Sequence, residues 1–466
     1  MSQKECFIYH TNDLHSHFEQ WKKVSSFIKR ARFSHEKRQE ECLFFDIGDH
    51  VDRSSFVTEG TTGQANVKLL NELKVDAVTI GNNEGITFSK QELDCLYKDA
   101  EFSVLVANLK EQNGTHPQWV KPFEIKTLGN GLKIGLIGLT FPYELFYKQI
   151  GWKIEDPFSV IQTYVDHLRP QVDIVIVLSH LGLSSDEWLA EHIHGIDIIL
   201  GGHTHHLLKE GKKINDTLIA QVGRYGYYVG QIKIVYDEEK KKIMTKEAGA
   251  ISIEKLENEQ ETSKLLLTLE QEAENRMGEV VTTLETPIFH SWFEHSELAM
   301  LLAEGLAEWC GAEVSMMNAG VLLHGLPKGP VTFDHIHSIC PHPINPCKVT
   351  LRGDKLKEII LASFGADMQK LRVRGLGFRG RVMGMMAFYG LQVETYFGED
   401  GLNHVVSIKI NGKPVDPHRE YNIATLDMFT FGPLFPEMSV AKEKVYYLPE
   451  FIRDILSWKL QKTYVQ

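Results

Sequence analysis

Short apolar segments alternate with helical patterns through the first half of the chain, and this alternation limits the possible folds more than any other feature. The strand-like segments are Cys6–His10, Cys42–Ile47, Ala77–Ile80, Val104–Ala107, Lys133–Leu139, Asp173–Leu178 and Asp197–Leu200. Amphipathic helical patterns lie between several of them, at Gln64–Leu73 and at Pro157–Leu168, which a proline opens. Segments of these two kinds in alternation predict a layered α/β domain.

The sequence pattern changes twice along the chain and divides it into three parts. The alternation, completed by hairpin-like stretches at Trp119–Thr127 and Leu218–Asp237, predicts a first domain at residues 1–250. Residues 251–277 are charged and contain leucines, which predicts a linker helix. A coiled-coil helix is the alternative, but the apolar positions do not sustain a heptad. Residues 278–466 mix strand and helix patterns and predict a second, α+β domain.

Composition and charge exclude several classes of protein. The 466 residues include 62 acidic and 50 basic side chains, a net charge of −12, which argues against an electrostatic grip on a long nucleic acid. No apolar run approaches the roughly 20 residues of a transmembrane helix, so we expect no membrane span. The first residues show no secretory signal and the six cysteines form no C-x-x-C pair. We therefore expect a cytoplasmic protein with reduced thiols.

Residues that commonly bind metals follow the strand-like segments of the first half. They are Asp13, His15, Asp49, Asn82, His180, His203 and His205. Because ligands of an open α/β sheet bind at the carboxyl ends of its strands, we expect these side chains to converge. Imidazole and carboxylate together, with one carboxylate free to bridge, suit a pair of divalent ions such as Mn, Zn, Fe or Co better than Mg or Ca.

Each of these residues alone would carry little weight. A single aspartate at a strand end is most often a helix cap, and a single histidine is most often a surface or core residue. A glycine, however, stands directly before Asp49, Asn82 and His203, where the backbone must turn sharply and pass close to an ion. The ordered set therefore indicates a metal site.

These motifs resemble the calcineurin-like metallophosphoesterases, and among them the bacterial 5'-nucleotidases that also hydrolyse UDP-sugars and 2',3'-cyclic nucleotides. The resemblance lies in D-x-H, G-D, G-N, a strand-terminal histidine and G-H-x-H, at Asp13–His15, Gly48–Asp49, Gly81–Asn82, His180 and Gly202–His205. It implies a four-layer αββα sandwich with two divalent metal ions.

The same resemblance implies a role for each ligand. Asp49 would bridge the two ions, and the remaining ligands divide into two sets. These sets are Asp13, His15 and His205 for one ion, and Asn82, His180 and His203 for the other. The segment Gly48–Arg53 also resembles the phosphoprotein phosphatase relatives, in which the arginine contacts phosphate, and this implies that Arg53 anchors phosphate.

The second half resembles the nucleotidase C-terminal domain, and a generic α+β domain is the alternative. The matching segments are Asn318–Gly320, Gly329–Thr332, Asn345 and Lys348–Leu361. Two departures affect nucleotide recognition: a leucine, Leu322 or Leu323, replaces the usual arginine, and MFTFGP at Met428–Pro433 replaces G-G-D-G-Y.

Aromatic and basic side chains of the second half are the candidate substrate contacts. Phe429 and Phe431 would stack a base, and Asn318 belongs to the same predicted site. The arginines of the segment LRVRGLGFRGR would bind phosphate oxygens bidentately; they are Arg372, Arg374, Arg379 and Arg381, with Arg379 as the predicted contact. A solvated basic loop is the alternative for this cluster.

The third motif departs from the family pattern. Most members have G-N-H-E, whose histidine assists the leaving group, whereas this chain has Asn83 at that position, and Ile86 where a second acid is usual. An asparagine donates a hydrogen bond but transfers no proton, so a general-acid contribution of roughly 10²–10⁴ in rate would be missing. His50 is the nearest replacement in sequence, and a structural role for it is equally supported. The candidate catalytic residues are therefore Asn83, His50 and Arg53.

We accordingly expect a hydrolase that acts on a small phosphate ester, either a nucleotide or a cyclic or sugar-nucleotide diester, by metal-activated hydroxide. The alternative is a catalytically weak metal-dependent module that binds or senses a nucleotide. Asn83 and Ile86 favour the binding module. Retention of all seven metal ligands favours the enzyme, because a binding scaffold has little use for them.

Overall fold

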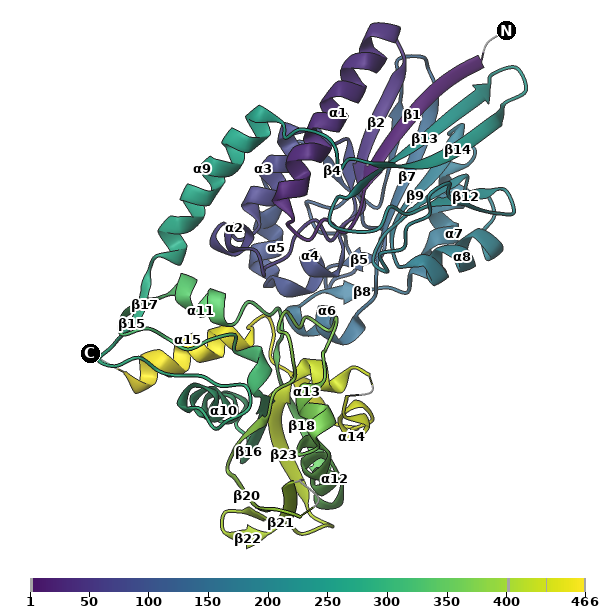
Figure 1. Cartoon of the computed structure of the whole chain (residues 1–466). Helices are drawn as coiled ribbons and strands as arrows, with labels where there is room; N and C mark the ends of the chain where they lie inside the picture. Colours follow the sequence, from purple (N-terminus) through teal and green to yellow (C-terminus); the bar gives the residue numbers. More distant parts are fainter. Residues whose placement is uncertain (1–2, 400–402, 433, 465–466) are drawn as a thin grey trace. The chain divides into compact units, whose positions relative to one another are not determined.

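The structure is a computed structural model that describes residues 3–399, 403–432 and 434–464 (Figure 1). The chain forms two compact units, Met1–Ala273 and Glu274–Gln466, and the division falls inside helix α9 (Gln260–Met277). Among the described residues, no helix is both long enough and apolar enough to cross a membrane. All six cysteines are described, and each is a free thiol.

The described part of unit 1 contains two six-stranded sheets. The first has the strand order β14-β13-β1-β2-β3-β4 and consists of β1 (Gln3–Thr11), β2 (Glu41–Asp46), β3 (Ala77–Val78), β4 (Ser103–Val104), β13 (Tyr228–Asp237) and β14 (Lys242–Ser252). The second has the order β11-β12-β10-β9-β7-β6 and consists of β6 (Phe123–Thr127), β7 (Lys133–Thr140), β9 (Ile174–His180), β10 (Ile198–Gly201), β11 (Lys212–Ile214) and β12 (Thr217–Ala220). A small sheet pairs β5 (Leu109–Lys110) with β8 (Lys153–Ile154).

The helices of unit 1 lie between these strands in sequence. They are α1 (Phe18–Arg38), α2 (Phe56–Gly60), α3 (Gln64–Glu72), α4 (Asn82–Thr87), α5 (Lys90–Leu96), α6 (Glu144–Ile150), α7 (Pro157–Leu168) and α8 (Leu183–His192). The sequence pattern did not single out α1, although Trp21, Val24 and Ile28 line one face of it at helical spacing and are buried.

The two large sheets pack face to face with helices outside them (Figure 1). Along β9, Ile174, Ile176 and Leu178 enter the core between the sheets, while Val175 and Val177 enter the core beneath α7 and α8. Both faces of this strand are therefore covered, which explains its uninterrupted apolar sequence. Helices α1, α3 and α5 cover the outer face of the first sheet. This confirms the expected four-layer αββα sandwich.

Strand register brings the carboxyl ends of the inner strands to a common edge. Strands β1 and β2 are parallel, with Thr11 opposite Asp46, and β2 and β3 are parallel, with Asp46 opposite Val78. In the second sheet, β7 and β9 are parallel up to the pair Thr140 and His180. The loops that follow these strands therefore start side by side within each sheet.

Helix α9 is shorter than the linker helix expected at 251–277, because it begins at Gln260. The carboxylate of Glu259 accepts a hydrogen bond from the backbone amide of Thr262 at 2.7 Å, which satisfies an otherwise unpaired amide of the first turn. Leu266 and Leu269 belong to the core beneath the first sheet. Most of α9 therefore packs on unit 1.

Unit 2 is an α+β unit, whose described part has a central five-stranded sheet in the order β19-β16-β23-β18-β24. Its strands are β15 (Val280–Leu284), β16 (Val314–Asn318), β17 (Gly329–Thr332), β18 (Pro346–Arg352), β19 (Met386–Tyr389), β20 (Leu391–Phe397), β21 (Asn403–Ile410), β22 (Lys413–Pro414), β23 (Glu420–Leu426) and β24 (Lys444–Tyr446). Its helices are α10 (Glu297–Cys310), α11 (Phe333–Ile339), α12 (Gly353–Ser363), α13 (Ala366–Lys370), α14 (Pro436–Ser439) and α15 (Ile452–Thr463), with 3₁₀ turns η1 (Ala319–Val321) and η2 (Asp427–Thr430). Strands β20, β21 and β22 form one smaller sheet, and β15 and β17 another.

Phe45 is fully buried in the core between the two large sheets, so we expect the stability of the fold to depend strongly on it. Replacing Phe45 by alanine should lower the free energy of unfolding by about 3–5 kcal/mol, because the lost ring leaves a cavity in a close-packed core. The matched control is Phe33→Ala on α1, where the ring is 58% exposed and the loss should be small. Urea unfolding of both variants checks this, and equal midpoints would contradict the packing described.

Candidate metal centre

The loops after the inner strands of unit 1 hold several residues in the left-handed backbone region. These residues have φ between 48° and 73°, and apart from Ser16 they are the five residues Asp13, His15, Asp49, His203 and His205. Residues other than glycine rarely adopt this conformation, and such strain concentrates at functional sites. All five are among the metal ligands expected from the sequence.

The side chains of these loops form two groups. In the first, Asp13, His15 and His205 offer ligand atoms that all lie within 4.8 Å of one another. His15 Nε2 and His205 Nε2 are 3.2 Å apart, and His205 Nε2 is 3.3 Å from Asp13 Oδ1. Two imidazole nitrogens and a carboxylate oxygen thus face one point.

The second group contains Asp49, His180 and His203, whose ligand atoms also lie within 4.8 Å of one another. Asn82 adjoins this group, because its Oδ1 is 2.8 Å from His203 Nδ1. Asp49 Oδ2 lies 3.5 Å from His180 Nε2 and 3.8 Å from His15 Nε2. The structure therefore brings all seven expected ligands together, with Asp49 between the two groups.

A buried histidine nitrogen shows that this arrangement fits a cation. His180 Nδ1 donates a hydrogen bond to the carbonyl oxygen of Ile47 at 2.6 Å, which leaves Nε2 as the ring nitrogen that can face a metal ion. His180 Nε2 is buried and has no hydrogen-bond partner among the described residues. It faces the carboxylates of Asp49 and Asp13, at 3.5 and 3.9 Å. A bound metal ion would satisfy this nitrogen.

The charges at the centre favour a positive ion. Burial opposes a charge on His180, yet the negative charge of Asp49 outweighs it and raises the pKa of His180 to about 10. Burial likewise opposes the charge on Asp49, and the neighbouring His180 nevertheless lowers the pKa of Asp49. The carboxylates thus create a strongly negative potential inside a buried site, which a divalent cation would neutralise.

Glycines permit the close approach of the loops. A Cβ atom on Gly81 would lie 2.1 Å from Asp49 Oδ1, and one on Gly48 would lie 2.3 Å from the backbone nitrogen of Gly81. A Cβ atom on Gly202 would lie 2.9 Å from His180 Nδ1. Side chains at Gly81 and Gly202 would therefore displace candidate ligands, and a side chain at Gly48 would collide with the backbone of the Gly81 loop.

Glu84 ties two of these loops together, a role that the sequence analysis did not assign. Its carboxylate accepts hydrogen bonds from the backbone amides of Asp49, Val51 and Gly81, at 3.0, 2.9 and 2.8 Å. Burial, and then the charge of Asp49, raise the pKa of Glu84 to about 7. The acidic residue two positions after Asn82 was the sequence signal for this contact.

Asn83 contacts a candidate metal ligand directly. Its Nδ2 lies 2.9 Å from His15 Nδ1 and donates to the carbonyl oxygen of Val51 at 2.8 Å. Its backbone amide donates to Asp49 Oδ1 at 2.8 Å. Asp52, another residue that the sequence analysis did not name, has Oδ2 at 3.6 Å from His15 Nδ1. The side chain of Asn83 therefore helps to orient the ring of His15.

His50 does not join the metal-ligand groups. Its ring packs edge-on against Trp21, with centroids 4.6 Å apart, and its Nδ1 lies 3.1 Å from Asn66 Nδ2. Burial lowers the pKa of His50 to about 3, so the ring is neutral at physiological pH. Of the two roles considered for His50, these contacts favour the structural one over replacement of the family acid, because the side chain turns into the helical layer.

Arg53 is also directed elsewhere. Its guanidinium forms a bidentate pair with Glu59 at 2.8 and 2.9 Å and donates to the carbonyl oxygen of Thr87 at 2.6 Å. The side chain is only 9% exposed. These contacts fasten α2 to the end of α4, so Arg53 has a structural role and the expected phosphate contact is not supported.

The expected substrate contacts of unit 2 differ in accessibility. Asn318 is fully buried and its Nδ2 donates to the carbonyl oxygen of Met383 at 2.9 Å. Phe429 is fully buried against Phe435. Neither is available to a ligand in this structure, which corrects both expectations. Phe431 is half-buried and stacks on Tyr446, with centroids 5.9 Å apart.

The arginine cluster lies on the segment between α13 and β19. Its four members, Arg372, Arg374, Arg379 and Arg381, are all exposed, and the backbone amide of Arg379 donates to His342 Nδ1 at 2.8 Å. Pro433, at the end of the MFTFGP segment, lies outside the described residues. Of the predicted substrate contacts in unit 2, only Arg379 is exposed, and Phe431 is partly so.

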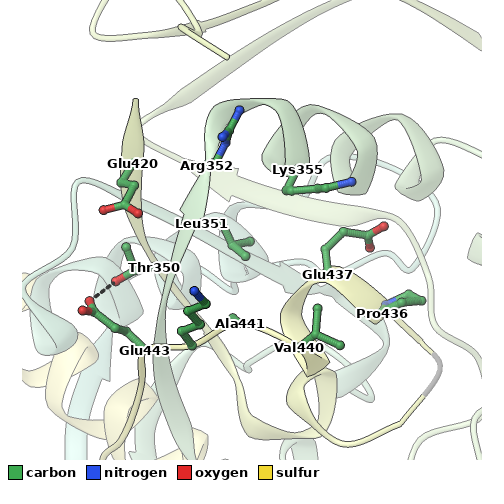
Figure 2. A pocket seen from close by; sticks show the side chains of 11 residues that line it. Thr350, Leu351, Arg352, Lys355, Glu420, Pro436, Glu437, Val440, Ala441 and Glu443 are labelled. Atoms are coloured by element: carbon green, nitrogen blue, oxygen red, sulfur yellow. Dashed lines mark hydrogen bonds between the residues drawn. The ribbon is translucent and has the colours of Figure 1, made fainter. Parts of the chain in front are cut away.

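Figure 2 shows a separate surface pocket in unit 2, of about 520 Å³, beside β18, α12 and α14. Its basic lining residues are Arg352, Lys355 and Lys442, and its acidic ones are Glu420, Glu437 and Glu443. The Thr350 hydroxyl donates to Glu443 at 3.2 Å. The opposite charges balance and no histidine lines the pocket, so it offers no counterpart to the metal-ligand groups.

Comparisons with known proteins agree with the fold and with the motifs. The sequence matches the Calcineurin-like phosphoesterase family over residues 8–207 and the 5'-nucleotidase, C-terminal domain family over residues 278–432. The uncharacterized metallophosphoesterase YunD of Bacillus subtilis is 47% identical over 454 residues, which cover 97% of this chain and 98% of that protein. The chain belongs to the calcineurin-like phosphoesterase family. Members of this family are phosphate-ester hydrolases that use divalent metals.

More distant relatives extend this calcineurin-like phosphoesterase match to solved structures. Bovine 5'-nucleotidase is 23% identical over 76% of this chain and 71% of that protein. The 5'-nucleotidase precursor of Thermus thermophilus superposes with a TM-score of 0.61 at 21% identity, covering 99% of this chain and 97% of that one. Haemophilus influenzae NAD nucleotidase superposes with a TM-score of 0.68 at 18% identity, covering 100% and 97%. The two structures show a shared fold, and the family expected from the sequence motifs is confirmed.

The fit of the centre to cations predicts that metal removal lowers stability. Chelation by EDTA should lower the melting temperature of the metal-loaded protein, because ions that bind only the folded state stabilise it by about 2.7 kcal/mol at a concentration of 100 Kd. Differential scanning fluorimetry with metal analysis measures this, and Mn²⁺ added back in excess of EDTA should restore the melting temperature. An unchanged melting temperature, with the metal shown to be gone, would contradict the site described.

Proposed function

We propose that this phosphoesterase is a hydrolase with two divalent metal ions and that its substrate is a small phosphate ester of the nucleotide class. The observation that carries the proposal is the position of Asp49, whose carboxylate lies within 4 Å of an imidazole nitrogen in each of the two ligand groups, at 3.8 and 3.5 Å. One carboxylate placed between two His/Asp groups is suited to two metal ions that share it.

The donor atoms support a particular class of ions. Asp13, His15 and His205 would hold one ion, and Asn82, His180 and His203 the other. Imidazole donors favour Mn, Zn, Fe or Co over the hard ions Mg and Ca. When bound, such ions supply Lewis-acid charge for phosphoryl oxygens and a water of lowered pKa.

The chain's own residues set the geometry around these ions. Asn83 and Asp52 hold the far side of the His15 ring, and the Ile47 carbonyl holds the far side of His180. Such contacts fix the orientation and tautomer of a ligating histidine. Glu84 accepts hydrogen bonds from three backbone amides and so keeps the Asp49 loop against the Gly81 loop.

Proton transfer to the leaving group is the weak step of this site. Asn83 occupies the position of the usual family acid and transfers no proton, and His50 is turned away and neutral. Substrates whose leaving group departs without protonation should therefore react best. This favours sugar-nucleotides, whose leaving group is a phosphate, over nucleoside monophosphates, whose leaving group is a sugar alkoxide.

A metal-dependent binding or sensing module is the second candidate, and the engagement of Asn83 with His15 favours it. Turnover separates the two functions. The Mn²⁺-loaded protein should hydrolyse 4-nitrophenyl phosphate, bis(4-nitrophenyl) phosphate and members of a nucleotide panel. Binding of nucleotides without turnover of any of these esters would support the module instead.

Asp49→Asn should abolish both activity and metal pairing, because a neutral amide no longer neutralises two ions. Metal analysis of the purified variant should show the loss of at least one ion per chain. The matched control is Asp166→Asn, which changes an exposed carboxylate on α7. Two ions with near-normal turnover in Asp49→Asn would remove Asp49 from the bridging role.

Asn83→His should accelerate the hydrolysis of nucleoside monophosphates, by about 10²-fold at most, and should change the hydrolysis of activated aryl phosphates little. A proton donor lowers the barrier only where negative charge accumulates on the leaving oxygen. Asn83→Ala is the matched control, because it removes the amide without adding a donor. Equal slowing of both substrate types by Asn83→His would mean that the histidine disturbs the His15 ring instead of acting as an acid.

A further inference from the structure

A surface pocket of about 360 Å³ borders the first ligand group within unit 1. Its lining consists of His205, Gly223, Arg224, Tyr225, Tyr227 and Tyr228. The side chain of His205 is 30% exposed, whereas that of Asp13 is fully buried. His205 is therefore the member of this group that the pocket shares, and it connects the metal-ligand residues to open space.

The loop that forms the pocket is fastened to the Asp13 loop. The backbone amide of Tyr225 donates to the carbonyl oxygen of Asp13 at 2.7 Å, and Asn12 Nδ2 donates to the carbonyl oxygen of Gly223 at 2.6 Å. Tyr225 itself has φ of 64°, between Gly223 at 78° and Gly226 at 69°. A tyrosine held in this strained conformation beside a metal-ligand loop suggests a function for its ring.

The ring of Tyr225 supports a cation. It packs against His17 at a tilt of 31°, with centroids 3.8 Å apart, and meets His15 edge-on at 5.9 Å. The guanidinium of Arg224 lies over the Tyr225 ring, 4.5 Å from its centroid. Arg224 is exposed, and no carboxylate of the described residues pairs with it. An arginine without an acidic partner, in a chain of net charge −12, is free to bind an anion.

The distance between Arg224 and the candidate metal position limits which anion this is. Arg224 NH1 lies 3.4 Å from His205 Nδ1, whereas the nitrogen that faces Asp13 and His15 is Nε2, on the opposite side of the ring. The guanidinium is therefore one imidazole ring away from the ligand atoms. It is too far to hold the phosphoryl group under attack, and it is well placed for a neighbouring group of the same substrate.

We propose that Arg224, supported by Tyr225, binds a second anionic group carried by the leaving group of the substrate. This inference rests on the proposed function and names its preferred substrates: phosphate esters and anhydrides whose leaving group bears a carboxylate or a further phosphate. In the reaction, a water oxygen bonds to phosphorus, the bond from phosphorus to the leaving oxygen breaks, and the electron pair stays on that oxygen. The protons of the water pass to solvent.

The missing acid supports this preference independently. Asn83 supplies no proton, so the leaving oxygen must accept the electron pair unaided. A leaving phosphate does so readily, because its negative charge is spread over several oxygens. A guanidinium close to the leaving group would stabilise that charge further.

Three non-hydrolysable compounds test the proposal: phenylphosphonate, 3-carboxyphenylphosphonate and 4-carboxyphenylphosphonate. The Mn²⁺-loaded wild type should bind one of the carboxylated compounds about tenfold more tightly than phenylphosphonate, the effect expected of a charge-assisted hydrogen bond. Arg224→Gln should abolish this preference, and Arg224→Lys should reduce it. Arg30→Gln, at an exposed position on α1, is the matched control and should retain it.

Calorimetry and ligand-induced melting shifts measure this preference without turnover, so the result is separate from that for the proposed function. Equal binding of all the phosphonates by the wild type, or a preference that survives in Arg224→Gln, would overturn the inference. Failure of the wild type to hydrolyse any phosphate ester, with the preference intact and Arg224-dependent, would overturn the proposed function alone. Because Arg224 is exposed, the variants should fold, and their melting temperatures without ligand check this.

Discussion

The attraction between buried carboxylates and buried imidazoles at the strand ends is the interaction on which the rest of unit 1 depends. Asp49 lies 3.5 Å from His180 Nε2, and both side chains are almost fully buried. Without a cation, such a cluster confines negative charge in a poorly solvated interior, which is costly. The four-layer sandwich tolerates it because its strands end together and its glycines let the loops approach.

The same constraint explains why the loops are so rigidly connected. The Glu84 carboxylate accepts hydrogen bonds from three backbone amides, and Asn83 contacts His15, Val51 and Asp49. Apart from the bond between Glu84 and Gly81, which lies within one loop, each of these contacts joins two loops that follow different strands. A site assembled from separate strands requires such cross-links, because an error of one ångström in a ligand position weakens both metal binding and catalysis.

The exchange of the usual histidine for Asn83 changes the chemistry that the site favours. The Asn83 side chain contacts the His15 ring, and the nearby His50 packs against Trp21 instead. The guanidinium of Arg224, with which no carboxylate of the described residues pairs, lies on the open side of the centre, next to His205. With Asn83 unable to transfer a proton and Arg224 beside His205, we propose that the site suits substrates whose leaving group is already anionic.

The sequence by itself determined the layered fold of unit 1 and the seven candidate ligands, because strand-like segments followed by Asp, His and Asn, with glycines before three of them, leave few alternatives. It did not determine the surroundings of single side chains. His50 and Arg53 stand beside Asp49 in sequence, yet Trp21 and Asn66 hold the first and Glu59 and Thr87 hold the second. Asn318 is likewise buried and donates to Met383, which is distant in sequence, and Phe429 is buried against Phe435. Only tertiary structure decided these cases, because the direction of a side chain depends on the neighbours that packing and register bring to it.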